Sequence, residues 1–367
     1  MTDFDPRGFL ERAVETPSHE NVDEMRSFLR ETLCEHDVEP TVDDAGNVTA
    51  TRTGDSDGPH IVLNTHIDTV APHVPPSRDG DILSGRGSCD AKGPLAAMLA
   101  AFFDSDPDDG RVTLAITPDE EVYSTGAAAL VPELDLDPER GDAVIVGEPT
   151  GLDVCTAAKG RFEGRIELRG ESAHAAEPES GTNAIPLAAR AIEALSGFDD
   201  RPDGLDAHPD LGAPTLTPTV IEGGDATNQV AGACEVVLDR RSVPPETANG
   251  YETGLDGYLR ERLGSGVSFE LTDRKTPFLE AFETDADAGV VRAFRDLGCA
   301  ARPFTAATEA SYFARRAPTV VFGPGVLADE EGPVAHADRE YVRLPAVERA
   351  TELLDEVVGK CLRETGS

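Results

Sequence analysis

Residues 60–70 read HIVLNTHIDTV, an apolar run that ends in a histidine and an aspartate two positions apart. The run predicts a buried strand. Side chains two residues apart lie on the same face of a strand, so Asp68 can reach the imidazole of His66 and orient it. A polar group of this kind at the end of a buried strand is what an α/β sheet offers at its binding edge.

The segments that follow repeat this arrangement. After the glycine-rich turn GRGS at 85–88, Asp90 comes just before KGPLAAMLAAFF at 92–103, an alanine-rich predicted helix with Pro94 in its first turn. Two further runs, RVTLAITPD at 111–119 and DAVIVGE at 142–148, are β-rich and end in acids. We therefore expect several ligands at one edge of one sheet.

Five short segments contribute residues of the types that bind divalent metals: His66, Asp90, Glu120 with Glu121, Glu148 and His336. Histidine and carboxylates are ligands that zinc accepts. Two metal ions about 3.5 to 4 Å apart need one shared bridge and terminal ligands for each ion. The set is large enough for both ions and leaves one glutamate as a proton shuttle. Taken singly, each residue has a simpler explanation as a solvated acid or as part of a turn.

The order of predicted elements changes near Lys159. Strand, helix, strand, strand, helix and strand are expected at 162–168, 183–195, 215–221, 234–239, 245–263 and 267–271. This is the βαββαβ order of a ferredoxin-like unit, and it contains no member of the metal set. We predict an inserted lid domain at 160–273 and an α/β catalytic domain at 1–159 and 274–367. Helices are expected in the first 36 residues and at 347–362, and a loop at 197–214.

Composition limits the function classes. The 367 residues exceed the usual size of one domain, so two domains are expected. With 70 acidic and 32 basic residues the formal charge is −38, and the acids are spread along the chain. Such self-repulsion is tolerable in molar salt, where the screening length is about 3 Å, so the charge favours a halophile's protein. Nucleic acid and anionic membranes are poor partners for it.

No apolar run has membrane-spanning length and the acidic N-terminus does not resemble a signal peptide, so we expect a cytoplasmic enzyme.

Nine motifs together resemble the co-catalytic zinc aminoacylase and carboxypeptidase G family, which includes acetylornithine deacetylase and succinyl-diaminopimelate desuccinylase. They run in order from about residue 60 to 341 and include the predicted lid. The motifs are HIDTV, GRGSCDAKGPLAA, DEE, GEPT, SAHAAEPESGTNAI, TNQV, LDRRSVPPE, FGPG and AHADREY. The resemblance implies a zinc-peptidase-like domain with a central mixed sheet and a homodimer formed through the lid.

The resemblance also implies residue roles. His66 and Glu148 would complete one zinc site, Glu121 and His336 the other, and Asp90 would bridge two zinc ions per subunit, which cobalt or manganese can replace. Asp68 would orient His66, and Glu120 would be the general base. In the lid, His174 would donate to the oxyanion in the partner subunit's site. Substrate-binding roles would fall to Asn228, Arg241 and Thr308. Apart from the resemblance, basic residues near the site of so acidic a chain are expected to bind anions, so either Lys159 or Arg161 could join Arg241 in holding the carboxylate.

The activity implied is zinc-dependent removal of the acyl group from an N-acyl amino acid. We expect succinyl-diaminopimelate desuccinylase slightly ahead of acetylornithine deacetylase, in lysine or arginine biosynthesis. A dipeptidase or carboxypeptidase of the same family is the alternative, and a non-catalytic metal- or peptide-binding module is a more distant one. Two departures affect the substrate pocket. Family members often have a tryptophan-bearing segment between the motifs that correspond to HIDTV and GRGS, whereas this chain has no tryptophan and a shorter link. Thr308 is followed by Glu309 where relatives commonly have Asp.

Overall fold

The computed structural model describes residues 4–363, which form two compact units. The first unit comprises Met1–Ala157, Glu283–Phe304 and Thr308–Ser367, and the second comprises Ala158–Phe282 with Thr305–Ala307. The chain thus leaves the first unit after Ala157 and returns at Glu283, later than the predicted boundary at residue 274. Residues 1–3 and 364–367, the outer ends of the predicted catalytic domain, lie outside the described residues.

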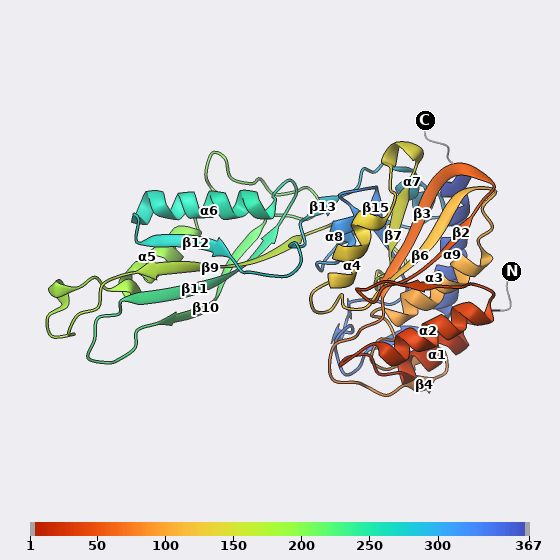
Figure 1. Ribbon diagram of the computed structural model, residues 1–367, viewed down its shortest axis with the longest axis horizontal. Coiled ribbons are helices and arrows are strands. Elements are labelled where there is room, and N and C mark those ends of the chain that lie inside the picture. The colour runs from red at the N-terminus through yellow and green to blue at the C-terminus, as the bar shows by residue number, and fades with distance from the viewer. Residues whose placement is uncertain (1–3, 364–367) are drawn as a thin grey trace. The chain divides into compact units, whose positions relative to one another are not determined.

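A nine-stranded mixed sheet forms the centre of the first unit, in the order β1-β2-β6-β3-β7-β15-β8-β13 with β14 paired to β8. Figure 1 labels β2, β3, β6, β7, β15 and β13 of this sheet. Its strands are β1 (Thr41–Val42), β2 (Val48–Thr53), β3 (Ser56–His66), β6 (Asp109–Thr117), β7 (Ala143–Val146), β8 (Val154–Ala158), β13 (Phe282–Glu283), β14 (Ala301–Phe304) and β15 (Thr319–Val321). Four adjacent strands of this sheet are parallel: β6 pairs with β3, β3 with β7, and β7 with β15. Their carboxyl ends therefore meet at one edge of the sheet.

Helices cover this sheet. They are α1 (Pro6–Glu15), α2 (Asp23–Glu35), α3 (Lys92–Asp104), α4 (Thr125–Leu130), α7 (Gly289–Asp296), α8 (Ala310–Phe313) and α9 (Leu344–Arg363), with short 3-10 turns η1 (Val131–Glu133) and η2 (Pro138–Arg140). Helices α3 and α9 pack against β3 and β6, and α1 packs on α3. Because α3 is covered on every side, all of its residues up to Phe103 are buried, which explains its alanine-rich sequence.

Two small sheets complete the first unit. Strand β5 (Ile82–Ser84) lies between β4 (Ser77–Asp79) and β18 (Tyr341–Arg343), and β16 (Ala328–Asp329) pairs with β17 (Gly332–Pro333). Through the β5–β18 pair, the glycine-rich turn that begins at Gly85 lies next to the segment that ends at Glu340: the Gly85 N–H donates to the Glu340 carbonyl at 3.0 Å.

The second unit is a four-stranded antiparallel sheet in the order β10-β11-β9-β12 with two helices. Its elements are β9 (Gly160–Arg169), η3 (Pro178–Ser180), α5 (Ala184–Leu195), β10 (Thr215–Gly223), β11 (Ala233–Ser242), α6 (Ala248–Leu263) and β12 (Val267–Leu271). Side chains alternate between buried and exposed along β9 and β11, as expected for a sheet with helices on one face only. The predicted βαββαβ order is confirmed.

The fold class predicted from the sequence is therefore confirmed: a mixed α/β unit with an inserted ferredoxin-like unit. Local sequence explains several boundaries. The Asn183 side chain accepts from the Ile185 N–H at the start of α5, and Thr247 caps α6 in the same way. Among residues 4–363, none of the helices combines the length and the apolar content that crossing a bilayer requires.

Candidate metal centre

Three strand ends bring the predicted ligands together. His66 is the last residue of β3, Glu120 and Glu121 follow the end of β6, and Glu148 comes two residues after β7. These three strands are parallel neighbours, so the groups at their carboxyl ends converge. Asp90 reaches the same place from the turn that precedes α3.

His336 approaches from the loop between β17 and β18. Its backbone φ is +65°, in the left-handed region that a residue with a Cβ rarely adopts. Conformations of this kind cost of the order of 1 to 3 kcal/mol and are concentrated at functional sites. The imidazole itself is about half exposed, with 52% of its side-chain surface accessible.

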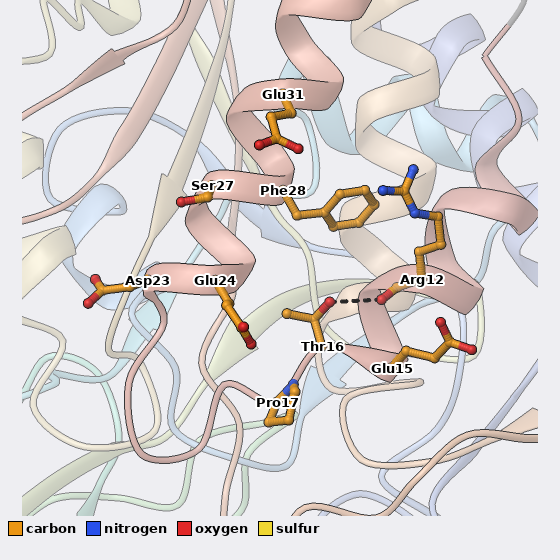
Figure 2. A pocket seen from close by; sticks show the side chains of 9 residues that line it. All are labelled: Arg12, Glu15, Thr16, Pro17, Asp23, Glu24, Ser27, Phe28 and Glu31. Atoms are coloured by element: carbon orange, nitrogen blue, oxygen red, sulfur yellow. Dashed lines mark hydrogen bonds between the residues drawn. The ribbon is translucent and has the colours of Figure 1, made fainter.

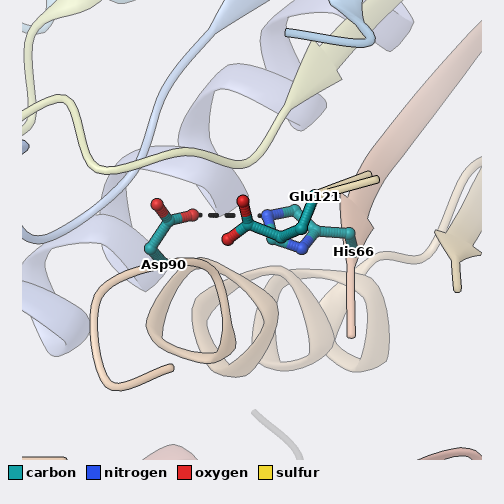
Figure 3. A group of neighbouring side chains, drawn as sticks. All are labelled: His66, Asp90 and Glu121. Atoms are coloured by element: carbon teal, nitrogen blue, oxygen red, sulfur yellow. Dashed lines mark ion pairs between the residues drawn. The ribbon is translucent and has the colours of Figure 1, made fainter. Parts of the chain in front are cut away.

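Asp90 directs its two oxygens to two different histidines. Oδ1 lies 3.3 Å from His66 Nε2, and Oδ2 lies 3.1 Å from His336 Nε2. The same His336 nitrogen lies 3.0 Å from Glu121 Oε1. Figure 3 shows Asp90, Glu121 and the His66 ring pointing toward one another. A carboxylate with one oxygen toward each of two ligand groups has the geometry that bridging two ions needs.

Asp68 organises the ends of β3 and β6. The His66 Nδ1–H is within hydrogen-bonding distance of the Asp68 carbonyl at 3.1 Å and of Oδ1 at 3.2 Å, which turns Nε2 toward Asp90. Oδ1 and Oδ2 also accept the backbone N–H groups of Glu120 and Glu121, each at 3.0 Å. One buried carboxylate thus fixes both the imidazole and the backbone of the paired glutamates.

Thr308 and Glu309 hold neighbouring groups. The buried Thr308 hydroxyl donates to Glu148 Oε1 at 3.1 Å, although the sequence suggested a contact with substrate. The fully buried Glu309 accepts from the Thr117 hydroxyl at 2.7 Å. Burial raises the pKa of Glu309 to about 7.

The side chains fit a divalent metal pair. Ligand atoms of His66, Asp90 and Glu121 lie within 4.8 Å of one another, and so do those of His66, Glu120 and Glu148. The buried His66 Nε2 lies 3.3 Å from Asp90 Oδ1 but makes no hydrogen bond of good geometry among the described residues. Burial, followed by repulsion from nearby carboxylates, raises the pKa of both Glu120 and Glu148 well above the usual range. Hydrogen bonds to Asp90 and Glu121 raise the pKa of His336 to about 10. Cations would relieve this crowding of negative charge.

Glu340 and Arg86 support the site and were not among the predicted residues. Both side chains are buried, and Arg86 Nη1 lies 2.8 Å from Glu340 Oε2. In the sequence, only their positions within the motifs GRGS and AHADREY point to a role for them. A buried arginine cannot be recognised from a motif alone, because its partner lies far along the chain.

His174 and Asn228 lie together in the second unit. The backbone at His174 bridges to Gln229, and the Ala175 N–H donates to the Asn228 carbonyl at 2.9 Å. His174 is exposed, and its Nδ1 accepts from the Ala176 N–H at 3.1 Å. That bond leaves Nε2 as the nitrogen that carries a proton in the neutral ring.

Arg241 and Lys159 lie at the other end of the same sheet. Arg241 is paired in register with Arg161, and Asp239 bonds to Arg241 Nε at 2.8 Å. The Lys159 ammonium donates to the Ala213 carbonyl at 2.6 Å, and partial burial lowers its pKa. His174 follows β9, whereas Lys159 precedes it. The ten residues of β9 separate the two groups by about 30 Å.

A separate hollow of about 540 Å³ lies between α1 and α2 (Figure 2). Arg12 packs over the Phe28 ring at 4.4 Å, and several acids line the rim. The hollow contains none of the predicted site residues.

Residues 62–360 match the model of Peptidase family M20/M25/M40. The chain belongs to this family. A Pyrobaculum aerophilum protein named as a LysW-lysine/LysW-ornithine hydrolase is 38% identical over 234 residues, or 63% of this chain and 64% of that protein. The chain therefore spans just under two thirds of that relative's length. An acetylornithine deacetylase of Pectobacterium atrosepticum is 31% identical over 328 residues, or 84% of this chain and 81% of the relative.

A solved structure supports the fold. A Bacillus subtilis protein described as a dinuclear metal binding peptidase from the M20 family has a TM-score of 0.72 and 16% identity, and the likeness covers 98% of both chains. Membership of the M20/M25/M40 family confirms the predicted metallohydrolase class, an enzyme that acts on amide bonds.

Proposed function

We propose that this chain is a zinc-dependent amidohydrolase that removes the acyl group from an N-acyl amino acid. The observation that supports it most is the placement of Asp90, with one oxygen toward His66 and the other toward His336. In this proposal His66 and Glu148 hold one ion, Glu121 and His336 hold the other, and Asp90 is shared by both.

When bound, the two ions supply Lewis-acid activation of water and of the scissile carbonyl. Glu120 takes the proton of the attacking water at a carboxylate oxygen and gives it to the leaving amine. Its place beside His66 and Glu148 supports this role. Asp68 keeps the His66 ring and the Glu120 backbone fixed while the proton moves. Asp68 therefore acts as a positioning residue.

The released amino acid is, in this proposal, ornithine or lysine, or a closely related diamino acid. Two relatives support it: one is named an acetylornithine deacetylase and the other a hydrolase for LysW-lysine and LysW-ornithine. These names favour release of ornithine or lysine over the desuccinylation expected from the sequence. Arg241 would bind the carboxylate of the amino acid, because a guanidinium matches a carboxylate with two hydrogen bonds.

We also propose a homodimer formed through the second unit, with His174 acting in the partner subunit's active site. Strand β10 is an exposed edge, with Val220 and Ile221 about half exposed. Such an edge favours pairing with another chain. The length of β9 supports action across the dimer. His174 and Asn228 lie too far from Arg241 and Lys159 for all four to contact one small substrate from the same chain.

A substrate panel tests the proposal. Zinc-loaded protein in high salt would be assayed with N-acetylornithine, N-acetyllysine, N-succinyl-diaminopimelate and dipeptides, with the metal content of each sample measured. We expect hydrolysis of the acyl-ornithine or acyl-lysine substrates with two zinc ions per chain. Preferred cleavage of dipeptides would identify the protein as a dipeptidase. Preferred cleavage of N-succinyl-diaminopimelate would support the desuccinylase activity expected from the sequence.

A further inference from the structure

A buried ion pair lies beneath the turn that carries Asp90 and the loop that carries His336. Arg86 is 1% exposed and Glu340 is 0% exposed at their side chains. Removing such a charge from water is costly unless its partner and its remaining hydrogen bonds are in place. The contacts of these two side chains therefore show what the pair is built to hold.

The contacts go to the backbones of both segments. Glu340 Oε1 accepts the N–H groups of Cys89 at 3.1 Å and Asp90 at 3.2 Å. Arg86 Nη1 donates to the carbonyl of Ala337, the residue after His336, at 3.1 Å. The same guanidinium donates from Nε to the Pro72 carbonyl at 3.1 Å. The pair thus ties the peptide at Asp90 to the peptide next to His336.

The other candidate ligands are anchored differently. His66 is part of β3, and Glu148 follows β7 and bonds to Thr308. Both depend on the central sheet, which holds them whether or not Glu340 is present. Asp90 and His336 lie on two irregular segments, and their 3.1 Å separation spans those segments. Glu121 also lies in a turn, but its backbone N–H is held by Asp68 rather than by Glu340.

We propose that Glu340 is a positioning residue that, with Arg86, sets the distance between Asp90 and His336. Through that distance it controls the affinity of one ion, the one held by Asp90, Glu121 and His336. The ion held by Asp90, His66 and Glu148 depends on it much less. This inference rests on the dinuclear site in the proposed function.

Glu340→Gln tests the role. It keeps the size of the side chain but has one acceptor oxygen in place of two, so it cannot accept from Arg86 and from the Cys89 and Asp90 N–H groups together. Asp142→Asn is the matched control in the same unit. Asp142 is as deeply buried, pairs with Arg140 at 2.6 Å and accepts the backbone N–H groups of His60 and Asp137, both at 2.7 Å. It lies just before β7, at the opposite end of that strand from Glu148.

The measurement is calorimetric titration of zinc into metal-free protein, together with the melting temperature of the metal-free protein. We expect Glu340→Gln to keep one ion at wild-type affinity and to weaken the other about 10- to 100-fold, as is usual when a group that orients a ligand is lost. We expect Asp142→Asn to lower the melting temperature and leave both affinities unchanged. Equal weakening of both ions by Glu340→Gln, no weakening, or the same effect from Asp142→Asn would each overturn the proposal.

A second variant, Arg86→Lys, tests the same role if the Glu340→Gln protein does not fold. Arg86→Lys keeps the charge but cannot contact Pro72, Ala337 and Glu340 together, because an ammonium lacks the planar fork. It should weaken the same ion selectively, and wild-type affinity for both ions would contradict the proposal. If the unmodified protein itself binds fewer than two ions, the dinuclear proposal fails. Two ions in the wild type and unchanged affinities in the variants would refute only the role of Glu340.

Discussion

Two neighbouring glutamates in the metal centre have different expected roles. The backbone of each is held by one oxygen of Asp68, so the two side chains start from fixed and adjacent positions. Glu121 contacts His336, whereas Glu120 lies near His66 and Glu148. Their substitution should therefore have different effects on metal content.

Replacement of Glu120 should stop the chemistry and leave the metals in place. We expect Glu120→Ala to lower kcat about 10²- to 10⁴-fold, the usual contribution of a general base, with two ions retained by elemental analysis. Glu133→Ala, which removes an exposed glutamate of the same unit, is the control. Loss of metal in parallel with activity would make Glu120 a ligand.

Replacement of Asp90 should remove more metal than replacement of either histidine. Asp90 has one oxygen toward each histidine, so Asp90→Ala takes a ligand from both ions, whereas His66→Ala and His336→Ala each take one from a single ion. Metal content after dialysis measures the difference. An Asp90→Ala protein that retains two ions would rule out bridging.

The sequence predicted much of this cluster because its residues lie at strand ends and in turns that are visible as local patterns. It could not predict the ion pair of Arg86 and Glu340, because these two residues are 254 positions apart in the chain. The Thr308 contact with Glu148 was missed for the same reason, since 160 positions separate them. Local patterns identify groups that could bind a metal, whereas the residues that orient those groups depend on the tertiary fold.

Strand β9 determines which residues of the second unit can act together. It places His174 and Asn228 near one end of the sheet and Lys159 and Arg241 near the other. The predicted strand at 162–168 was shorter than the observed β9, Gly160–Arg169, so the full separation was not apparent from the sequence. Strand β15 has only three residues, and nothing local predicts its place between β7 and β8.

Mixing two inactive variants should restore activity if His174 acts in the partner subunit. His174→Ala and Glu120→Ala subunits would be exchanged, and heterodimer formation would be verified with differently tagged chains. Each heterodimer should regain one intact site and about half of a normal dimer's activity. The unmixed variants serve as controls. No recovery after verified exchange would place His174 in its own chain's site or outside catalysis.

Loss of Arg241 should weaken substrate binding through the carboxylate. We expect Arg241→Met to raise KM roughly 10- to 100-fold, consistent with a lost charged hydrogen bond, with a smaller change in kcat. Esterifying the substrate carboxylate should raise KM for the wild type. In Arg241→Met it should raise KM little further. Arg165→Met, which removes a partly exposed arginine of the neighbouring strand β9, is the control. Equal turnover of acid and ester by the wild type would exclude this role.

The whole molecule carries a formal charge of −38, with acids spread through the sequence. Like charges on its surface repel one another, and salt reduces that repulsion over a screening length of about 3 Å at 1 M and about 10 Å at 0.1 M. We expect circular dichroism to show loss of structure on dilution from molar to about 0.1 M salt. Stepwise dilution with potassium chloride and with sodium chloride separates screening from ion-specific effects. An unchanged spectrum would mean that the charge has another origin.

The position of β15 has a consequence for synthesis of the protein. Strands β7 and β8 both pair with β15, but the ribosome makes β15 only after the whole second unit. About 160 residues separate the end of β8 from β15. At about 5 to 20 residues per second, the edges of β7 and β8 that pair with β15 therefore stay without this partner for roughly 8 to 32 seconds. His336 emerges later still. The second unit can therefore fold before the central sheet closes, and the complete set of metal ligands exists only once His336 has been made.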